Sequence, residues 1–257
     1  MREPLLEEHL NFMSAIHLRG MFQYIAQVSE LEQAQAGEYF SLITNPKEKG
    51  LNFISGMGEN QADYMPLIER FKKRNIPYLW FSYPLTPTLD VCLREQGLAP
   101  IMPITNVIYD LKNELPQRPQ QSNLSFIPVT TSSLFKIWCE IYASVSNLSL
   151  GLTQHFYKGV SPTPNVDSRM QLFLIRKNKD YVGSSLIDIQ NDIAGCYGDR
   201  VLPEHREQGI DSKMVYHRQE LAKLLGCSFI VAQCLDSSLG VYLKAGFQKG
   251  SPLALYH

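Results

Sequence analysis

One stretch of the sequence combines residue types that could bind a phosphate group. Residues 201–214 read VLPEHREQGIDSKM, and they lie where a predicted strand ends and a long predicted helix begins. Such a junction presents backbone N–H groups without intrahelical partners, at the positive end of the helix dipole. Gly209 would let an anion approach the backbone closely. The stretch lacks the glycine patterns of Rossmann and P-loop sites, so the residues alone leave open both a pyrophosphate site and an ordinary loop.

The same stretch resembles the signature of the GNAT superfamily of N-acetyltransferases, which use acetyl-coenzyme A. That signature is Arg or Gln, two residues, Gly, one residue, then Gly or Ala, between the fourth strand and the third helix. Arg206 and Gly209 match it, whereas Asp211 stands where the second small residue is expected. The resemblance implies that backbone N–H groups of 207–212 hold the pyrophosphate and that Val201 and Leu202 pair with the pantetheine arm. The implied coenzyme site consists of Val201, Leu202, Arg206, Glu207, Gln208, Gly209, Ile210, Asp211 and Ser212.

A second motif lies downstream at the distance that the family shows. Residues 242–247 read YLKAGF and resemble the closing Y-x-x-x-G-F of GNAT enzymes. The resemblance implies that Tyr242 lies near the coenzyme sulfur and acts as a general acid on the departing thiolate. Outside this context, Tyr242 would be interpreted as a core aromatic residue on a helix.

The sequence gives a weaker indication of the general base, the group that would take a proton from the amine substrate. Asp199 precedes the phosphate stretch on its strand, and it is the candidate base; Asp188 is on the preceding strand. Asp199 and Arg200 could also simply pair with each other. His205 and His217 have no metal-ligand spacing, so we expect them on the surface and expect no metal site.

The elements around these motifs in the C-terminal part alternate between strands and helices. Strands are expected at 126–129, 170–176, 181–189, 193–201, 228–234 and after Phe247, with a loop over 151–167. Helices are expected from Ser132 or Ser133 through Tyr142, over 211–225 and over 236–244. This order matches the α/β pattern of a mixed sheet flanked by helices.

The N-terminal part shows a weaker version of the same pattern. Residues 3–44 have helical spacing, with further helices expected over 63–74 and 89–96 and strands over 51–54, 78–81 and 106–111. Its stretch GMGEN at 56–60 lacks the Arg or Gln three residues before a glycine, and Leu93 stands in place of the tyrosine. We interpret this part as a degenerate GNAT-like domain that shapes the substrate site or the structure.

A linker separates the two parts. Residues 115–123 read LPQRPQQSN, with two prolines and three glutamines. The expected domains are therefore 1–118, the degenerate one, and 124–257, the acetyl-coenzyme A-binding one. Both are expected to be α/β (α+β) units with a mixed central sheet.

Composition excludes several other classes of protein. Hydrophobic residues make up 44% of the 257 residues, which is enough for a packed core. Lys and Arg number 24 against 25 Asp and Glu, so a nucleic-acid grip through bulk positive charge is not expected. No apolar run reaches the roughly 18 residues of a membrane helix. The five cysteines form no C-x-x-C pair, which indicates reduced thiols and a cytoplasmic location.

These observations predict an N-acetyltransferase that moves acetyl from acetyl-coenzyme A to a primary amine by direct attack. The acceptor stays open between a small molecule and a protein amine, and so does the oligomeric state. The alternative is a non-catalytic acyl-coenzyme A-binding or protein-interaction module. Its support is the three charged residues near the site, Asp199, Arg200 and Asp211.

Overall fold

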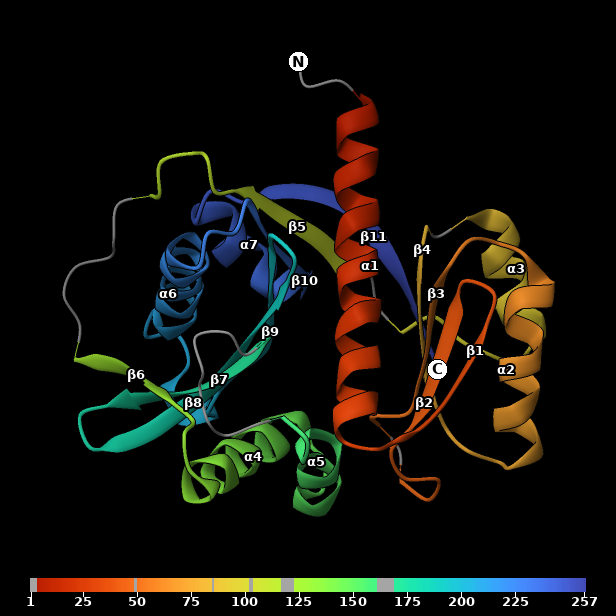
Figure 1. The fold of residues 1–257 in the computed structure, drawn as a ribbon, viewed down its shortest axis with the longest axis horizontal. Coiled ribbons are helices and arrows are strands. Elements are labelled where there is room, and N and C mark those ends of the chain that lie inside the picture. Colours follow the sequence, from red (N-terminus) through yellow and green to blue (C-terminus); the bar gives the residue numbers. More distant parts are fainter. Residues whose placement is uncertain (1–3, 49, 85, 102–103, 117–122, 161–168) are drawn as a thin grey trace.

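The computed structural model describes residues 4–48, 50–84, 86–101, 104–116, 123–160 and 169–257. Two lobes stand side by side, with the long first helix between them (Figure 1). Each lobe is built on strands that helices cover, so the expected mixed α/β class is confirmed. The proposed linker lies partly outside the described residues, because 117–122 are not among them.

Up to Asp110, the described residues form three helices and five strands, of which β1 to β4 build the sheet of the N-terminal lobe. Helix α2 is amphipathic: it buries Tyr64, Leu67, Ile68 and Phe71 against the sheet, and Asn60 caps its N-terminus. Arg70 and Arg74 at its other end pair with Glu32, as a basic helix terminus can. The elements are α1 (Pro4–Val28), β1 (Glu32–Ala36), β2 (Tyr39–Ile43), β3 (Phe53–Met57), α2 (Gln61–Lys73), β4 (Leu79–Tyr83), α3 (Pro87–Glu95) and β5 (Ile104–Asp110).

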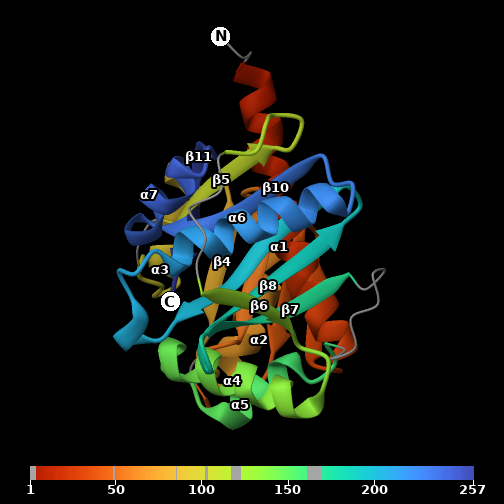
Figure 2. The same ribbon diagram turned by 90° about the vertical axis from the view of Figure 1, so that its left-hand side faces the viewer.

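The C-terminal lobe contains the elements that carry the two motifs. Figure 2 shows α6 running across its strands, with α4 and α5 beneath. The elements are β6 (Leu124–Pro128), α4 (Ser132–Ser146), α5 (Leu150–Tyr157), β7 (Met170–Lys177), β8 (Asp180–Gln190), β9 (Ile193–Val201), a 3₁₀ turn (Pro203–His205), α6 (Ile210–Leu224), β10 (Phe229–Leu235), α7 (Asp236–Lys244) and β11 (Gln248–Tyr256).

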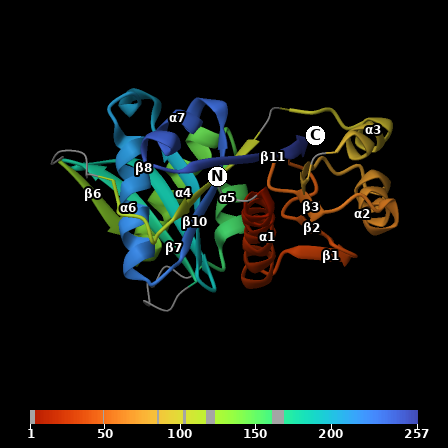
Figure 3. The ribbon, with the colours of Figure 1, turned by 90° about the horizontal axis from the view of Figure 1, so that it is seen from above.

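The two lobes exchange strands at their junction. The strand order is β1-β2-β3-β4-β11-β5-β10-β9-β8-β7-β6. Strand β5 of the N-terminal part thus lies between β10 and β11, pairing along β10 from Phe229 to Leu235. The end of β11 in turn pairs with Trp80, Phe81 and Ser82 of β4. Figure 3 shows β11 crossing from one lobe to the other.

Two expected elements differ from the structure. Residues 32–43 form a β-hairpin around Gly37, which has a φ of +51°, and not the end of a long helix. Glu, Gln and Ala favour helices, but pairing with the buried strand β2 outweighs that propensity. Residues 150–157, expected in a loop, form the helix α5, which Ser149 caps and which buries Leu152 and Phe156.

The largest buried cluster is shared by the two parts of the chain. It joins Phe22 and Phe53 of the N-terminal part to Trp138 and Phe156 of the C-terminal part. The ring centroids of Phe53 and Phe156 lie 6.1 Å apart in an edge-on contact. The lobes are therefore packed as one core, although the linker separates them in the sequence.

Candidate active site

The sheet of the C-terminal lobe opens between the parallel strands β9 and β10. These strands pair only from Ile193 to Cys196 on one side and Phe229 to Ala232 on the other. Gly198 then takes a φ of +65° where the register of β9 against β8 shifts, which bends β9 away from β10. The opening leaves a cavity of about 220 Å³. Asp199, Asp211 and Tyr242 all line it, so the structure brings these three expected residues together.

The Asp199 carboxylate is held by two neighbours. The two Nη atoms of the fully buried Arg218 guanidinium donate to it, with 2.5 Å between Nη2 and Oδ2. The Tyr242 hydroxyl donates to the same Oδ2 at 3.2 Å. The expected pair between the Asp199 and Arg200 side chains does not form. Asp199 pairs instead with Arg218 of α6, because the buried charge of Arg218 needs a counter-ion.

The Tyr242 hydroxyl stays protonated in this setting. Burial, and after it the Asp199 carboxylate, raise its pKa well above the ordinary value of tyrosine. The ring packs edge-on against Phe247, with centroids 5.1 Å apart. Tyr242 is therefore both a core aromatic and a hydrogen-bond donor at the wall of the cavity.

Arg200 points to the other side of β9. Its Nε donates to the Ser146 hydroxyl at 2.6 Å, and its guanidinium carbon lies 4.6 Å from the Tyr142 ring centroid. Its Nη1 donates to the backbone carbonyl of Asp199 at 2.7 Å. Within the described part of the chain, no carboxylate forms an ion pair with Arg200.

The expected phosphate stretch forms an open turn before α6. Glu207 and Gly209 have φ values of +61° and +70°, and no side chain caps the helix, which begins at Ile210. A Cβ on Gly209 would meet no atom within 4 Å. For residues 207–212, all of which the structure describes, no backbone N–H donates to a carbonyl outside the helix. The turn thus combines open space, N–H groups without a carbonyl partner outside the helix, and the positive end of a helix dipole.

Side chains on either side of this turn hold its shape. The Arg206 Nε donates to the Val201 carbonyl at 3.3 Å. Gln208 accepts from the Lys177 amine at 2.5 Å and donates to the Glu204 carbonyl at 3.2 Å. The turn is therefore fixed by the side chains of the motif.

At the end of β9, only some of the backbone groups face the opening between β9 and β10. The Leu202 N–H donates to the Val182 carbonyl of β8 at 3.0 Å, so it faces the neighbouring strand. Because successive residues of a strand point their backbone groups to opposite edges, Val201 faces the opening. Backbone pairing with a ligand is therefore possible through the N–H of Val201, whereas the Val201 carbonyl already accepts from Arg206 and the N–H of Leu202 is already used.

Asp211 lies at the mouth of the cavity, in the first turn of α6. Partial burial raises the pKa of its carboxyl, and the nearby Asp199 carboxylate adds to this effect. An Asp in the first turn also suits the helix dipole. The departure from the family signature therefore places a second acid beside Asp199.

Several residues of the site could not be recognised in the sequence. His17 of α1 reaches across to β9, where its Nδ1 lies 2.9 Å from the Tyr197 hydroxyl and its Nε2 lies 3.3 Å from the Ile193 carbonyl. Burial lowers the pKa of His17 to about 4, so the ring is neutral and its Nδ1 can accept a hydrogen bond from the Tyr197 hydroxyl. Gln233 of β10 lines the cavity, and its buried Oε1 has no partner among the described residues.

The remaining sequence candidates have structural roles. His217 is not on the surface as expected: its ring stacks on Phe126, with centroids 4.0 Å apart, because α6 packs this side chain against β6. Asp188 is fully buried in an ion pair with Arg169, with 2.8 Å between Nε and Oδ1. In the described ranges no group of His, Cys, Asp and Glu could hold a metal ion. Nor does any described helix have the length and apolar character needed to cross a membrane.

Among its described residues, the N-terminal lobe shows no comparable opening between its parallel strands. Its parallel strands β3 and β4 pair at all five positions from Phe53 to Met57. The Tyr39 ring lies against Gly56, so close that a Cβ there would be 2.4 Å from it. Leu93, at the position that corresponds to Tyr242, is fully buried in the lobe's own core.

The sequence and the fold of this chain are similar to those of known acetyltransferases. Residues 134–247 match the model of the acetyltransferase (GNAT) family. The chain is similar in structure to a GCN5-related N-acetyltransferase from Kribbella flavida (TM-score 0.68, 14% identity, covering 95% of this chain and 94% of that one). A GCN5-related N-acetyltransferase from Sphaerobacter thermophilus is also similar (0.60, 9%, 85% and 76%), and so is a tandem GNAT protein from the clavulanic acid biosynthesis pathway (0.57, 9%, 86% and 78%).

No curated protein matches the chain by sequence. The family match covers α4 to α7 and the turn before α6, and therefore the whole of the cavity between β9 and β10. The chain shares the fold of these acetyltransferase structures, and residues 134–247, less than half of the chain, match the model of the GNAT family.

Proposed function

We propose that this protein is an N-acetyltransferase that transfers acetyl from acetyl-coenzyme A to a primary amine. One observation carries the proposal: the opened sheet places the Tyr242 hydroxyl and the Asp199–Arg218 pair beside an uncapped helix terminus. The turn fits a pyrophosphate, because Gly209 leaves its surroundings open and the N–H groups of 207–212 lack carbonyl partners. When bound, acetyl-coenzyme A supplies the activated acetyl group.

The chain's own residues would divide the work as follows. The N–H groups at the start of α6 hold the phosphates, and the Val201 backbone orients the arm that leads into the cavity. The single hydroxyl proton of Tyr242 points to Asp199 Oδ2 in the free protein, and it would turn to the departing sulfur as the thiolate forms. Arg218 limits the negative charge that would build up next to Asp199 when that proton moves.

Asp199 fits a positioning role better than that of the base expected from its place on the strand. Both of its oxygens accept hydrogen bonds from Arg218, and one also accepts from Tyr242. A carboxylate in such a bidentate pair has little capacity left to accept a proton from an amine. We therefore propose that Asp199 orients Tyr242 and that water takes the proton of the acceptor.

The N-terminal lobe is proposed to be a degenerate GNAT-like unit without a coenzyme site. Strands β3 and β4 leave no opening, and Tyr39 fills the space beside Gly56. A likeness in fold to a tandem GNAT protein supports the duplication.

The coenzyme site can be tested with one substitution at each end of the same helix. Gly209→Glu brings a negative charge into the open turn, so the affinity for acetyl-coenzyme A should fall at least about tenfold. Gly226→Glu is the matched control, because Gly226 follows α6 with a φ of +78° and equally open surroundings. Calorimetry on both variants gives the comparison. Equal affinities in the two folded variants would show that the phosphates are not held at Gly209.

Turnover separates the enzyme from a binding module. Wild-type protein with acetyl-coenzyme A and a panel of amines should release free thiol, which a colorimetric reagent measures. Saturable binding of the coenzyme with no thiol release on any amine would instead favour the non-catalytic module. Asp211 at the cavity mouth would then be the first residue to examine, because it departs from the family signature.

A further inference from the structure

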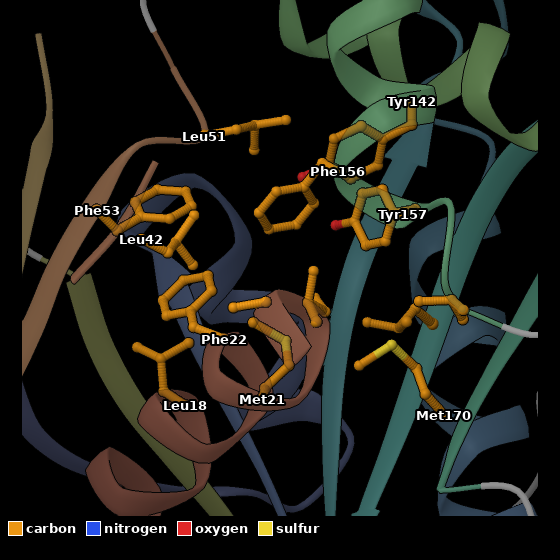
Figure 4. Packing of buried hydrophobic residues seen from close by; sticks show 14 of the residues in the cluster. Leu18, Met21, Phe22, Leu42, Leu51, Phe53, Tyr142, Phe156, Tyr157 and Met170 are labelled. Atoms are coloured by element: carbon orange, nitrogen blue, oxygen red, sulfur yellow. The ribbon is translucent and has the colours of Figure 1, made fainter. Parts of the chain in front are cut away.

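A second cavity lies on the opposite side of β9, between the two lobes. It has a volume of about 420 Å³, which suits a small molecule. Helix α1 and strands β3 and β4 form one wall, and α4, α5 and β9 form the other. Figure 4 shows side chains of both lobes facing one another across this region. Its aromatic lining includes Phe22, Phe53, Phe81, Tyr142, Phe156 and Tyr157, and Tyr197 of β9 also lines it.

The two cavities meet at the bend of β9. Tyr197, Gly198 and Arg200 line both of them. A molecule in the aromatic cavity that reaches this bend would lie next to the opening that Tyr242 and Asp199 line. That is the arrangement a two-substrate reaction needs, with the acyl donor on one side of β9 and the acceptor on the other.

The aromatic cavity has one charged group. Among its described lining residues, only Arg200 carries a charge. Ser146 and the Asp199 carbonyl hold two of its donor nitrogens, and the Tyr142 ring supports the guanidinium plane. The guanidinium is thus fixed in place, and no described carboxylate neutralises it. A fixed guanidinium in an apolar site is suited to bind a carboxylate.

We propose that the acceptor is a free α-amino acid with an aromatic or large aliphatic side chain. The inference rests on the proposed function and names the substrate class of that same site. The carboxylate pairs with Arg200, and the side chain occupies the aromatic cavity. Because one carbon separates the amine from the carboxylate, anchoring at the junction of the two cavities brings the amine to the opening of the sheet.

The step balances without a further reactant. The ammonium group first loses one proton to water, and its nitrogen then attacks the thioester carbon. A C–N bond forms, the C–S bond breaks with its electron pair on sulfur, and the sulfur takes a proton. The nitrogen loses a second proton to give the amide, so each turnover releases one proton.

Other amine classes fit this cavity less well. A polyamine would bring positive charges next to Arg200 into an apolar site. An amino sugar would bury hydroxyl groups against rings that offer few partners. A peptide N-terminus lacks the neighbouring carboxylate.

A substrate series on the wild-type protein tests the inference directly. The assay measures thiol release with acetyl-coenzyme A and confirms the N-acetyl product by mass. Phenylalanine should exceed phenylalanine amide, which lacks the charge, at least about tenfold in kcat/KM. Phenylalanine and leucine should each exceed alanine by about tenfold or more, because a larger side chain fills the cavity.

The Arg200→Met variant tests whether Arg200 recognises the carboxylate of the substrate. This variant keeps the length of the side chain and removes the charge, so the ratio of phenylalanine to its amide should fall to near one. Coenzyme affinity should stay unchanged and serves as the test of folding. Arg94→Gln is the matched control: it removes an exposed arginine of α3 and should keep the wild-type ratio.

The outcomes separate this inference from the proposed function. Turnover of spermidine or a peptide but not of any hydrophobic amino acid overturns the inference and leaves the acetyltransferase intact. Equal rates for phenylalanine and its amide overturn the role of Arg200 and the carboxylate. Failure to bind acetyl-coenzyme A overturns the proposed function, and binding without turnover of any amine overturns both.

Discussion

Replacing Tyr242 with phenylalanine tests the chemistry at the opening of the sheet. The change removes one oxygen and keeps the ring that packs against Phe247. Asp199 loses the hydrogen bond at 3.2 Å but keeps both bonds from Arg218, so no buried charge is left without a partner. A single bond to a charged acceptor that is otherwise satisfied should cost about 1.5 kcal/mol of unfolding free energy.

The effect on rate should be much larger than the effect on stability. Loss of a general acid typically lowers the rate by about 10²–10⁴, which corresponds to about 2.7–5.4 kcal/mol of barrier. Acetyl-coenzyme A affinity should change less than about threefold, because the hydroxyl acts on sulfur only as the thioester breaks. The variant should therefore lose kcat while it keeps its ligand.

Tyr256→Phe is the matched control for this experiment. The Tyr256 hydroxyl also donates to an aspartate, Asp90, but at the far lobe and away from both cavities. Thermal unfolding, coenzyme affinity and single-turnover rate should be measured on both variants. A Tyr242→Phe rate within about threefold of the control would remove the hydroxyl from the mechanism. An equal loss of rate in both variants would show that general destabilisation is the cause.

Two further predictions use the same assays. Bound phosphate should raise the already elevated pKa of Asp211 further, so the affinity for the coenzyme should increase as pH falls through that pKa. The Asp211→Asn variant should bind the coenzyme about fivefold more tightly near neutral pH, because roughly 1 kcal/mol of repulsion is removed. Its affinity should also depend less steeply on pH. A weaker-binding asparagine variant would contradict this. A fragment of residues 104–257 should retain more folded structure than 122–257, because the shorter one also lacks β5 between β10 and β11. Circular dichroism and solubility compare the two fragments, and an equally folded 122–257 fragment would show that β5 is dispensable.

The sequence predicted those parts of the site that are local in the chain. Strand β9 and helix α7 have the bounds expected from periodicity, 193–201 and 236–244. The turn before α6 follows from a strand end, a glycine and a helix start within a few residues. Local signals of this kind depend on backbone conformation and need no knowledge of tertiary packing.

The side-chain network of the site was not predictable in the same way. Arg218 lies 19 residues from Asp199, and its position on α6 indicates an ordinary helical surface residue until the helix is packed on β9. The same holds for His17, which meets Tyr197 across the lobes, 180 residues away. Buried partners of this kind are set by tertiary contact, which a single sequence does not record.

The strand exchange gives the N-terminal lobe a function although it has no opening of its own. It supplies β5, which completes the sheet beside β10, and α1, β3 and β4, which form one wall of the aromatic cavity. The C-terminal lobe alone would leave that cavity open to solvent, and Arg200 would then bind a carboxylate in water, where such a pair contributes little. The proposed lack of a coenzyme site in the N-terminal lobe is therefore compatible with keeping the whole lobe, because both lobes line the proposed acceptor cavity.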